Sequence, residues 1–104
     1  NVKVVEDDVL KFKIGEFFDL IVLDAPKELL PKLFNKLAEF TTHSNIFLLW
    51  HGSCEEEEWN EEIRGRLREV SKVVYSFSVY GEEISACSYN EKGIKLLRQL
   101  YKEW

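Results

Sequence analysis

The residues best suited to chemistry in this 104-residue sequence stand where apolar runs end. Asp24 directly follows the run Leu20-Ile21-Val22-Leu23, and Ala25 and Pro26 come next. A carboxylate at the end of a buried strand lies at the sheet edge where α/β proteins bind their ligands. Asp24 and Pro26 are therefore the candidate catalytic residues, although an Asp at this point can also simply cap the helix that follows.

Three further residues are candidates for binding a cofactor. Asp7 and Asp8 follow the short predicted strand 2–6, and His51 follows the apolar run 46–50. A loop histidine can act as a base or a ligand, because its charge changes near neutral pH. The structural alternatives are a solvated turn for the two acids and a hydrogen-bonded framework role for His51. No further histidine or carboxylate stands at metal-ligand spacing from His51, so no metal site is expected.

Hydrophobic patterns predict the elements that position these residues. Continuous apolar runs are typical of strands buried on both faces of a parallel sheet, and apolar residues at helical spacing indicate helices. Ser53 and Glu56 form a capping-box pattern ahead of one helix. The last helix is expected to bury Ile94, Leu97, Leu100, Tyr101 and Trp104. The expected elements are strands at 2–6, 18–23, 46–50, 72–79 and 83–89, and helices at 27–40, 54–69 and 91–103.

These elements predict one α/β domain over residues 1–104. The expected architecture is three-layer and Rossmann-like, with a mainly parallel sheet of about five strands and a C-terminal antiparallel hairpin around Tyr80-Gly81-Glu82. Because the sequence starts at Asn1 and contains no Met, we expect it to be a piece of a longer domain or protein. Cys54 and Cys87 lie far apart and are expected to be free thiols.

Composition excludes several classes of function. A net charge of -5 argues against non-specific nucleic-acid binding, which needs a basic surface. The sequence has no apolar run near the roughly 20 residues that span a bilayer, and no signal-peptide pattern. We therefore expect a cytoplasmic protein without membrane partners.

The stretch NVKVVEDDVLKFKIGEFFDLIVLDAP resembles part of a class I S-adenosylmethionine-dependent methyltransferase. The resemblance implies that Asp8, with Asp7 beside it, lies near the cofactor's adenine amino group. It also implies that Asp24-Ala25-Pro26 lines the methyl-transfer pocket, where the protein mainly positions donor and acceptor. The later order of helix, apolar strand, helix and two antiparallel strands fits the same family.

The family's glycine-rich loop and its ribose-binding acid are not in the sequence. The resemblance therefore covers only the C-terminal half of such a domain, which is not expected to be catalytically competent alone. A missing domain half, or self-association through an exposed sheet edge, is the expected partner.

Two other functions stay open. DLIVLD resembles a Walker B strand of a RecA- or KaiC-like P-loop ATPase, which implies Mg-ATP near Asp24, but no P-loop sequence is present. A response-regulator receiver is excluded because Asp8 and Asp24 are too close in sequence. The remaining alternative is a non-catalytic interaction module that pairs through an exposed sheet edge, with an oligomer as its expected form.

Overall fold

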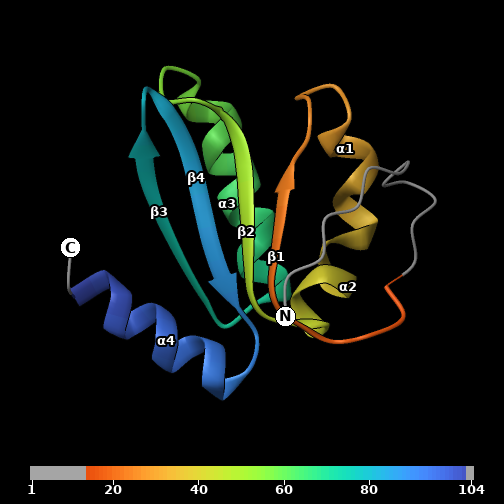
Figure 1. The fold of residues 1–104 in the computed structure, drawn as a ribbon. Coiled ribbons are helices and arrows are strands. Elements are labelled where there is room, and N and C mark those ends of the chain that lie inside the picture. The colour runs from red at the N-terminus through yellow and green to blue at the C-terminus, as the bar shows by residue number, and fades with distance from the viewer. Residues whose placement is uncertain (1–13, 103–104) are drawn as a thin grey trace.

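The computed structural model of the chain describes residues 14–102. It contains four strands and several helices in alternation (Figure 1). In chain order the elements are β1 (Phe18–Asp24), α1 (Leu30–Leu33), a 3-10 turn η1 (Phe34–Lys36), α2 (Leu37–Thr42), β2 (Ser44–Ser53), α3 (Glu57–Val70), β3 (Val73–Val79), β4 (Glu82–Ser88) and α4 (Glu91–Lys102). The predicted α/β class is confirmed. The predicted strand at 2–6 lies outside the described residues.

The four strands form one mixed sheet in the order β1-β2-β4-β3. Strands β1 and β2 are parallel, and β4 runs antiparallel to both of its neighbours. The expectation of a mainly parallel sheet with about five strands therefore does not describe residues 14–102. Strand β4 enters between β2 and β3, so among the strands of residues 14–102 only the neighbours β1 and β2 are parallel.

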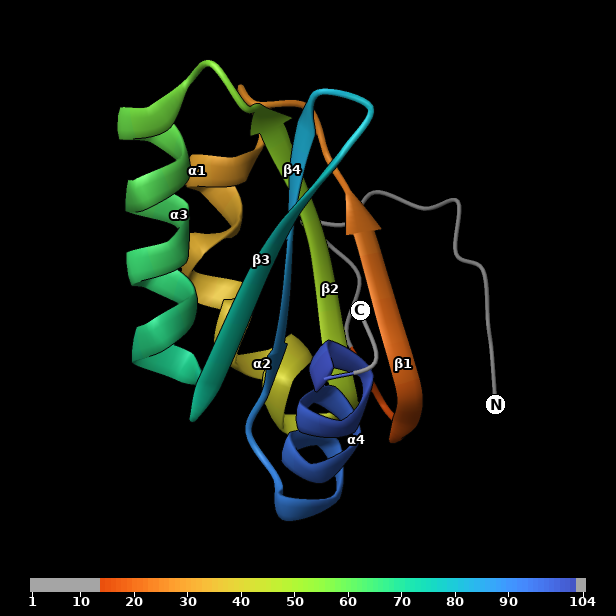
Figure 2. The ribbon, with the colours of Figure 1, turned by 90° about the vertical axis from the view of Figure 1, so that its left-hand side faces the viewer.

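Three of the four main helices pack on one face of the sheet (Figure 2). Helices α1, α2 and α3 cover this face, and the core lies between them and the sheet. Its most buried apolar side chains, all at most 1% exposed, are Leu30, Leu33, Leu37, Phe47, Leu49, Ile63, Leu67 and Cys87. Helix α4 lies on the opposite face and packs against β4, β2 and β3, near the end where β2 begins. The two faces of the sheet are thus covered very unequally.

The hairpin between β3 and β4 forms as the sequence predicts. Its two turn residues, Tyr80 and Gly81, have φ angles of 50° and 79°. Two successive left-handed residues are the signature of the tight turn that matches the twist of a hairpin, and glycine adopts this conformation without steric cost.

Both interior helices begin three residues later than expected. The first begins at Leu30 instead of Lys27, with Pro31 in its first turn, and a 3-10 turn interrupts it. Helix α3 begins at Glu57 because β2 continues through Ser53, which pairs with Glu82. The predicted capping box is wrong, since no side-chain hydrogen bond caps α3.

The final helix forms as predicted, but its apolar stripe is only partly buried. Ile94 and Leu97 are 6% exposed, whereas Leu100 and Tyr101 are 49% and 57% exposed. The expected burial of Leu100 and Tyr101 is therefore wrong, because both side chains line an open hollow between α4 and the sheet. Trp104 lies outside the described residues.

Candidate site at the carboxyl edge of the sheet

The parallel strands β1 and β2 end side by side, and two candidate residues come together there. Asp24 ends β1 and is in register with Trp50, the residue before His51 on β2. Side chains alternate along a strand, so Asp24 shares a face with Trp50, and His51 lies on the other face. The two predicted residues therefore sit on neighbouring strands but point to opposite sides of the sheet.

The carboxylate of Asp24 is exposed and does not cap the following helix. Helix α1 has Leu29 at its N-cap position, and no side-chain hydrogen bond is made there. The chain instead turns through Pro26, whose carbonyl oxygen accepts a hydrogen bond of 2.9 Å from the Leu29 amide. Within residues 14–102 we find no hydrogen-bond partner for the Asp24 carboxylate. It is free to bind a ligand, and the capping explanation does not account for it.

The loops that follow β1 and β2 are tied together by Lys27. Its ammonium group forms an ion pair with Glu56, which lowers the pKa of that carboxyl group mainly through the hydrogen bond. The same ammonium lies 5.2 Å from the ring centroid of Trp59, within cation–π range. Trp59 in turn donates a hydrogen bond of 2.6 Å to the carbonyl oxygen of His51. These contacts fix one loop against the other beside Asp24.

His51 is buried beneath the edge, and its side chain is 0% exposed. Its Nδ1 lies 2.9 Å from Oδ1 of Asn60, and its Nε2 lies 2.8 Å from Oγ of Ser85. Asn60 uses its amide nitrogen to donate to the carbonyl oxygen of Ser53, so its Oδ1 is the acceptor for His51. The imidazole therefore carries its proton on Nδ1, and the Ser85 hydroxyl donates to Nε2.

Burial lowers the pKa of His51 and so favours the neutral imidazole. Asn60 and Glu83 act in the opposite direction, and the Arg64 guanidinium acts in the same direction as burial. Glu83 also forms an ion pair with Arg64, which reduces its effect on the ring. A neutral, enclosed His51 can support the edge through the backbone of β2, and direct contact with a cofactor stays a prediction.

The hydrogen-bonded series Ser85–His51–Asn60 has the same sequence of groups as a catalytic triad: a nucleophile, a base and a residue that orients the base. Its environment, however, differs from that of a catalytic triad. Ser85 is 0% exposed, so no substrate reaches its hydroxyl. Its oxygen also lies 2.6 Å from the hydroxyl oxygen of Ser76 on the neighbouring strand. The network is a structural one, in which each buried polar group finds a partner.

Sequence reasoning missed Asn60 as part of this network, although a signal was present. Asn60 lies on the same helical stripe as Ile63 and Leu67, both of which are 0% exposed. A polar residue at a core position of an amphipathic helix needs a buried hydrogen-bond partner. That requirement points to a second buried polar group, which His51 supplies.

The remaining candidates are placed as follows. Pro26 is exposed in the loop beside Asp24, whereas Asp7 and Asp8 lie outside the described residues. Within residues 14–102 no group of three or more possible ligands is arranged to hold a metal ion. In the same range, no helix has the length and apolar character needed to cross a membrane.

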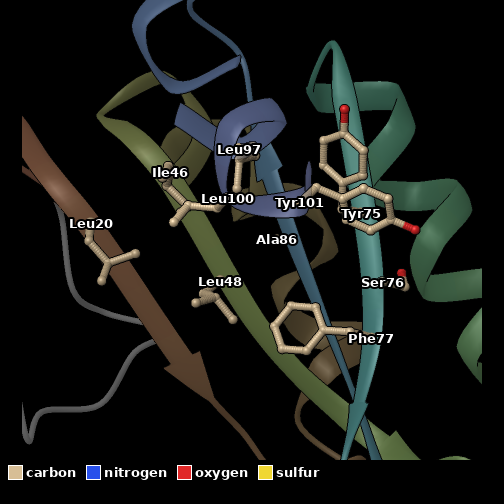
Figure 3. A pocket seen from close by; sticks show the side chains of 10 residues that line it. All are labelled: Leu20, Ile46, Leu48, Tyr75, Ser76, Phe77, Ala86, Leu97, Leu100 and Tyr101. Carbon is tan, nitrogen blue, oxygen red and sulfur yellow. The ribbon is translucent and has the colours of Figure 1, made fainter. Parts of the chain in front are cut away.

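An apolar cavity of about 590 Å³ lies on the opposite face from His51. It opens between α4 and the sheet, with side chains from all four strands around it (Figure 3). Its lining is almost wholly apolar, and Leu20, Leu48, Phe77 and Leu97 are representative. The sequence predicted apolar strands but not that this part of their surface would lie open.

No protein-family model, curated protein or solved structure matches the chain.

Proposed function

We propose that this chain is the C-terminal half of a methyltransferase-like Rossmann domain and supplies the acceptor side of a methyl-transfer site. The strand order is the observation that carries the proposal. In the class I fold that the sequence resembles, the fourth and fifth strands are parallel neighbours. The last strand of that fold runs antiparallel between the fifth and the sixth. The order β1-β2-β4-β3 and its strand directions agree with this pattern.

The arrangement of helices and the position of Asp24 support the same proposal. Helices α1, α2 and α3, which connect the successive strands, all lie on one face, as expected for the half of a doubly wound sheet that winds in one direction. Asp24, Ala25 and Pro26 stand at the carboxyl end of β1, and the Asp24 carboxylate is exposed and does not cap a helix.

S-Adenosylmethionine would supply an activated methyl group, and the residues of this chain would position the acceptor. Asp24 can accept a hydrogen bond from an acceptor N–H or O–H group, which orients that group for in-line attack. Pro26 limits the loop to few conformations. The tie between Lys27 and Glu56 holds this loop against the next one. The chain contains no glycine-rich cofactor loop, so we expect no turnover by the chain alone.

The P-loop alternative also requires a strand that the sheet of residues 14–102 does not contain. A phosphate-binding strand would have to run parallel beside β1 or β2 to bring phosphates to Asp24. The second side of β2 is taken by the antiparallel strand β4, so only the outer side of β1 could accept it. Mg-ATP is therefore the comparison ligand in the experiment.

Titration of the isotope-labelled full chain by NMR tests the proposal. We expect S-adenosylhomocysteine at millimolar concentration to shift the amide signals of residues 24–27, and Asp24→Asn to abolish these shifts. Asp19→Asn is the matched control, because Asp19 lies at the other end of the same strand. Shifts caused by Mg-ATP alone would favour the P-loop reading, and an absence of shifts with either ligand would contradict a cofactor site at this edge.

A further inference from the structure

The hollow between α4 and the sheet has its floor in one row of paired residues. Leu48 of β2 is in register with Ala86 of β4, and Ala86 is in register with Tyr75 of β3. Side chains of directly paired residues point to the same face of a sheet, so the methyl group of Ala86 stands between two much larger side chains. The floor is therefore lowest at Ala86, and the sequence of this row creates the hollow.

Helix α4 cannot sink onto the floor and close the hollow. Its first turn is seated at Gly93, where an added Cβ would stand 1.8 Å from the backbone oxygen of Asn45. Its last turns are held off the sheet by Tyr101, which stacks on Tyr75 with ring centroids 4.7 Å apart. Because both ends of the helix are held in this way, the volume of about 590 Å³ between helix and sheet stays open.

The hollow is narrow and partly roofed. Ala86 lines it from the sheet and Leu97 from α4, but they are only 5% and 6% exposed, so α4 covers the deepest part. The lining extends across the sheet from Leu20 of β1 to Phe77 of β3 (Figure 3). Neighbouring strands lie about 4.8 Å apart, so three spacings give a length of about 14 Å. A volume of about 590 Å³ over this length corresponds to a mean width of roughly 6–7 Å.

This width decides what can enter. An α-helix with its side chains is about 10–12 Å across and does not fit. The hollow is also too small to hold a second copy of the chain, because a stable interface takes about 20–30 residues a side and ten of the described residues line the hollow. An extended peptide is thin enough, but its amide and carbonyl groups would find no partners there, since β2 and β4 are paired on both sides. The last argument applies equally to the predicted strand at 2–6.

The chemistry of the lining selects the occupant. Among the residues that the structure describes, the lining is almost wholly apolar and includes no charged side chain. Its one aliphatic hydroxyl group, on Ser76, already lies 2.6 Å from the hydroxyl oxygen of Ser85. A ligand therefore gains free energy mainly by removing hydrocarbon from water. A hydrocarbon chain meets these conditions, because it carries no polar group that needs a partner and its carbon atoms pack at contact distances of about 4 Å.

We propose that the hollow binds a single hydrocarbon chain, such as the alkyl or acyl chain of a free amphiphile, and leaves the head group in water. Leu100 and Tyr101, which are 49% and 57% exposed, mark the open side through which the chain enters. Because α4 roofs the deepest part, a chain must leave any bilayer before it can enter, which favours a free amphiphile over a lipid in a membrane. The inference does not depend on the proposed function, since it needs neither S-adenosylmethionine nor a further domain half.

Methyl NMR spectroscopy of the isotope-labelled full chain tests the proposal. The probe is n-decyl maltoside below the concentration at which it forms micelles, and maltose is the control for its head group. We expect decyl maltoside to shift the methyl signals of Leu48, Ala86 and Leu97, and maltose to leave them unchanged. Phosphatidylcholine vesicles test the membrane-bound source. Cosedimentation of the chain with these vesicles, without binding of decyl maltoside, would contradict the proposal.

Two serine variants of α4 locate the site. Leu100→Ser removes an exposed side chain of the lining and should weaken binding at least about fivefold. Leu96→Ser is the matched control, because Leu96 is 39% exposed on the same helix but does not line the hollow. It should change binding less than about twofold. Both variants should fold, since both side chains are already exposed.

Filling the floor gives a second test. Ala86→Leu places a larger side chain in the hollow and should weaken binding at least about tenfold. Ala38→Leu makes the same change at an exposed position of α2 and should leave binding within about twofold. A folded Ala86→Leu chain that binds decyl maltoside as tightly as the wild type would place the ligand elsewhere and reject the proposal.

Further results would also overturn it. One is the absence of shifts in the methyl signals of the lining with decyl maltoside, and another is equal weakening by Leu100→Ser and Leu96→Ser. A third is binding that occurs only in Trp104→Ser, because the Trp104 side chain would then be the natural occupant. The last is a stable dimer of the chain, seen by light scattering, that Leu100→Ser dissociates, because the hollow would then belong to an interface between copies.

Discussion

The buried imidazole of His51 should make the stability of the fold depend on pH between about pH 5 and pH 7. Burial holds its folded-state pKa below the ordinary value of about 6.5. The unfolded chain therefore binds more protons as the pH falls. The contribution of His51 is fully present above about pH 6.5 and is lost progressively as the pH falls below that value.

The size of the effect follows from the linkage of protons to folding. Each pH unit over which only the unfolded chain is protonated removes about 1.4 kcal/mol from the free energy of unfolding. Between pH 7.5 and pH 5.0 the loss reaches at most about 2 kcal/mol. The carboxyl groups with lowered pKa values, Asp19, Glu56 and Glu61, start from ordinary values near 4 and lose their contributions mainly at lower pH.

Urea unfolding at several pH values between 5.0 and 7.5 measures this dependence. Tryptophan fluorescence is a suitable signal, because Trp59 donates a hydrogen bond to the His51 backbone. We expect the free energy of unfolding to fall with pH in the wild-type chain and to stay nearly constant in His51→Gln. His43 is retained in both chains, so it does not contribute to the difference.

A second variant separates the pKa effect from a simple loss of packing. In Asn60→Asp a carboxylate would stand beside Nδ1 of His51 and raise its pKa, so the loss of stability below pH 6.5 should be reduced. The reasoning would be refuted if the wild-type chain and His51→Gln showed the same slope over this range. It would equally be refuted if Asn60→Asp made the slope steeper.

Other substitutions give independent checks on the packing. Gly93→Ala should destabilise the fold by about 1–3 kcal/mol and displace α4, because the added Cβ would stand 1.8 Å from the backbone oxygen of Asn45. Thermal unfolding measures the loss of stability, and the NMR amide signals of α4 report its displacement. Gly65→Ala is the matched control inside α3, where a Cβ meets nothing within 4 Å, and should raise stability by up to about 1 kcal/mol. A thiol reagent should label Cys54 in the native chain but Cys87 only after unfolding. The reason is that Cys87 is buried, and burial raises the pKa of its thiol to about 12. Rapid labelling of both cysteines under native conditions would contradict the buried position of Cys87.

Local sequence patterns predict the strands and the last helix well. The runs at 20–23 and 46–50 are apolar without interruption, and both lie inside observed strands. The hairpin is equally clear from Tyr80-Gly81, because few residue pairs adopt two left-handed conformations in succession. These features depend on residues that are neighbours in the chain.

Features that depend on distant partners are not predicted. Strand β2 continues to Ser53 because Glu82, far along the chain, pairs with it, and this moves the start of α3. The position of β4 between β2 and β3 has no local signal at all. For the candidate site, the sequence correctly places Asp24 at a strand end. It does not show that His51 faces the opposite side of the sheet, because that depends on the pairing of β1 with β2.

The late entry of β4 also bears on how the chain is made. Strand β4 is the last strand to be synthesised, yet it lies between two strands that precede it. Until Ser88 has left the ribosome, one side of β2 has no neighbour, and β3 has nothing to join. A nascent chain that pauses before Glu82 would therefore expose a long, apolar, unpaired edge, which is the kind of surface that chaperones bind and that leads to aggregation.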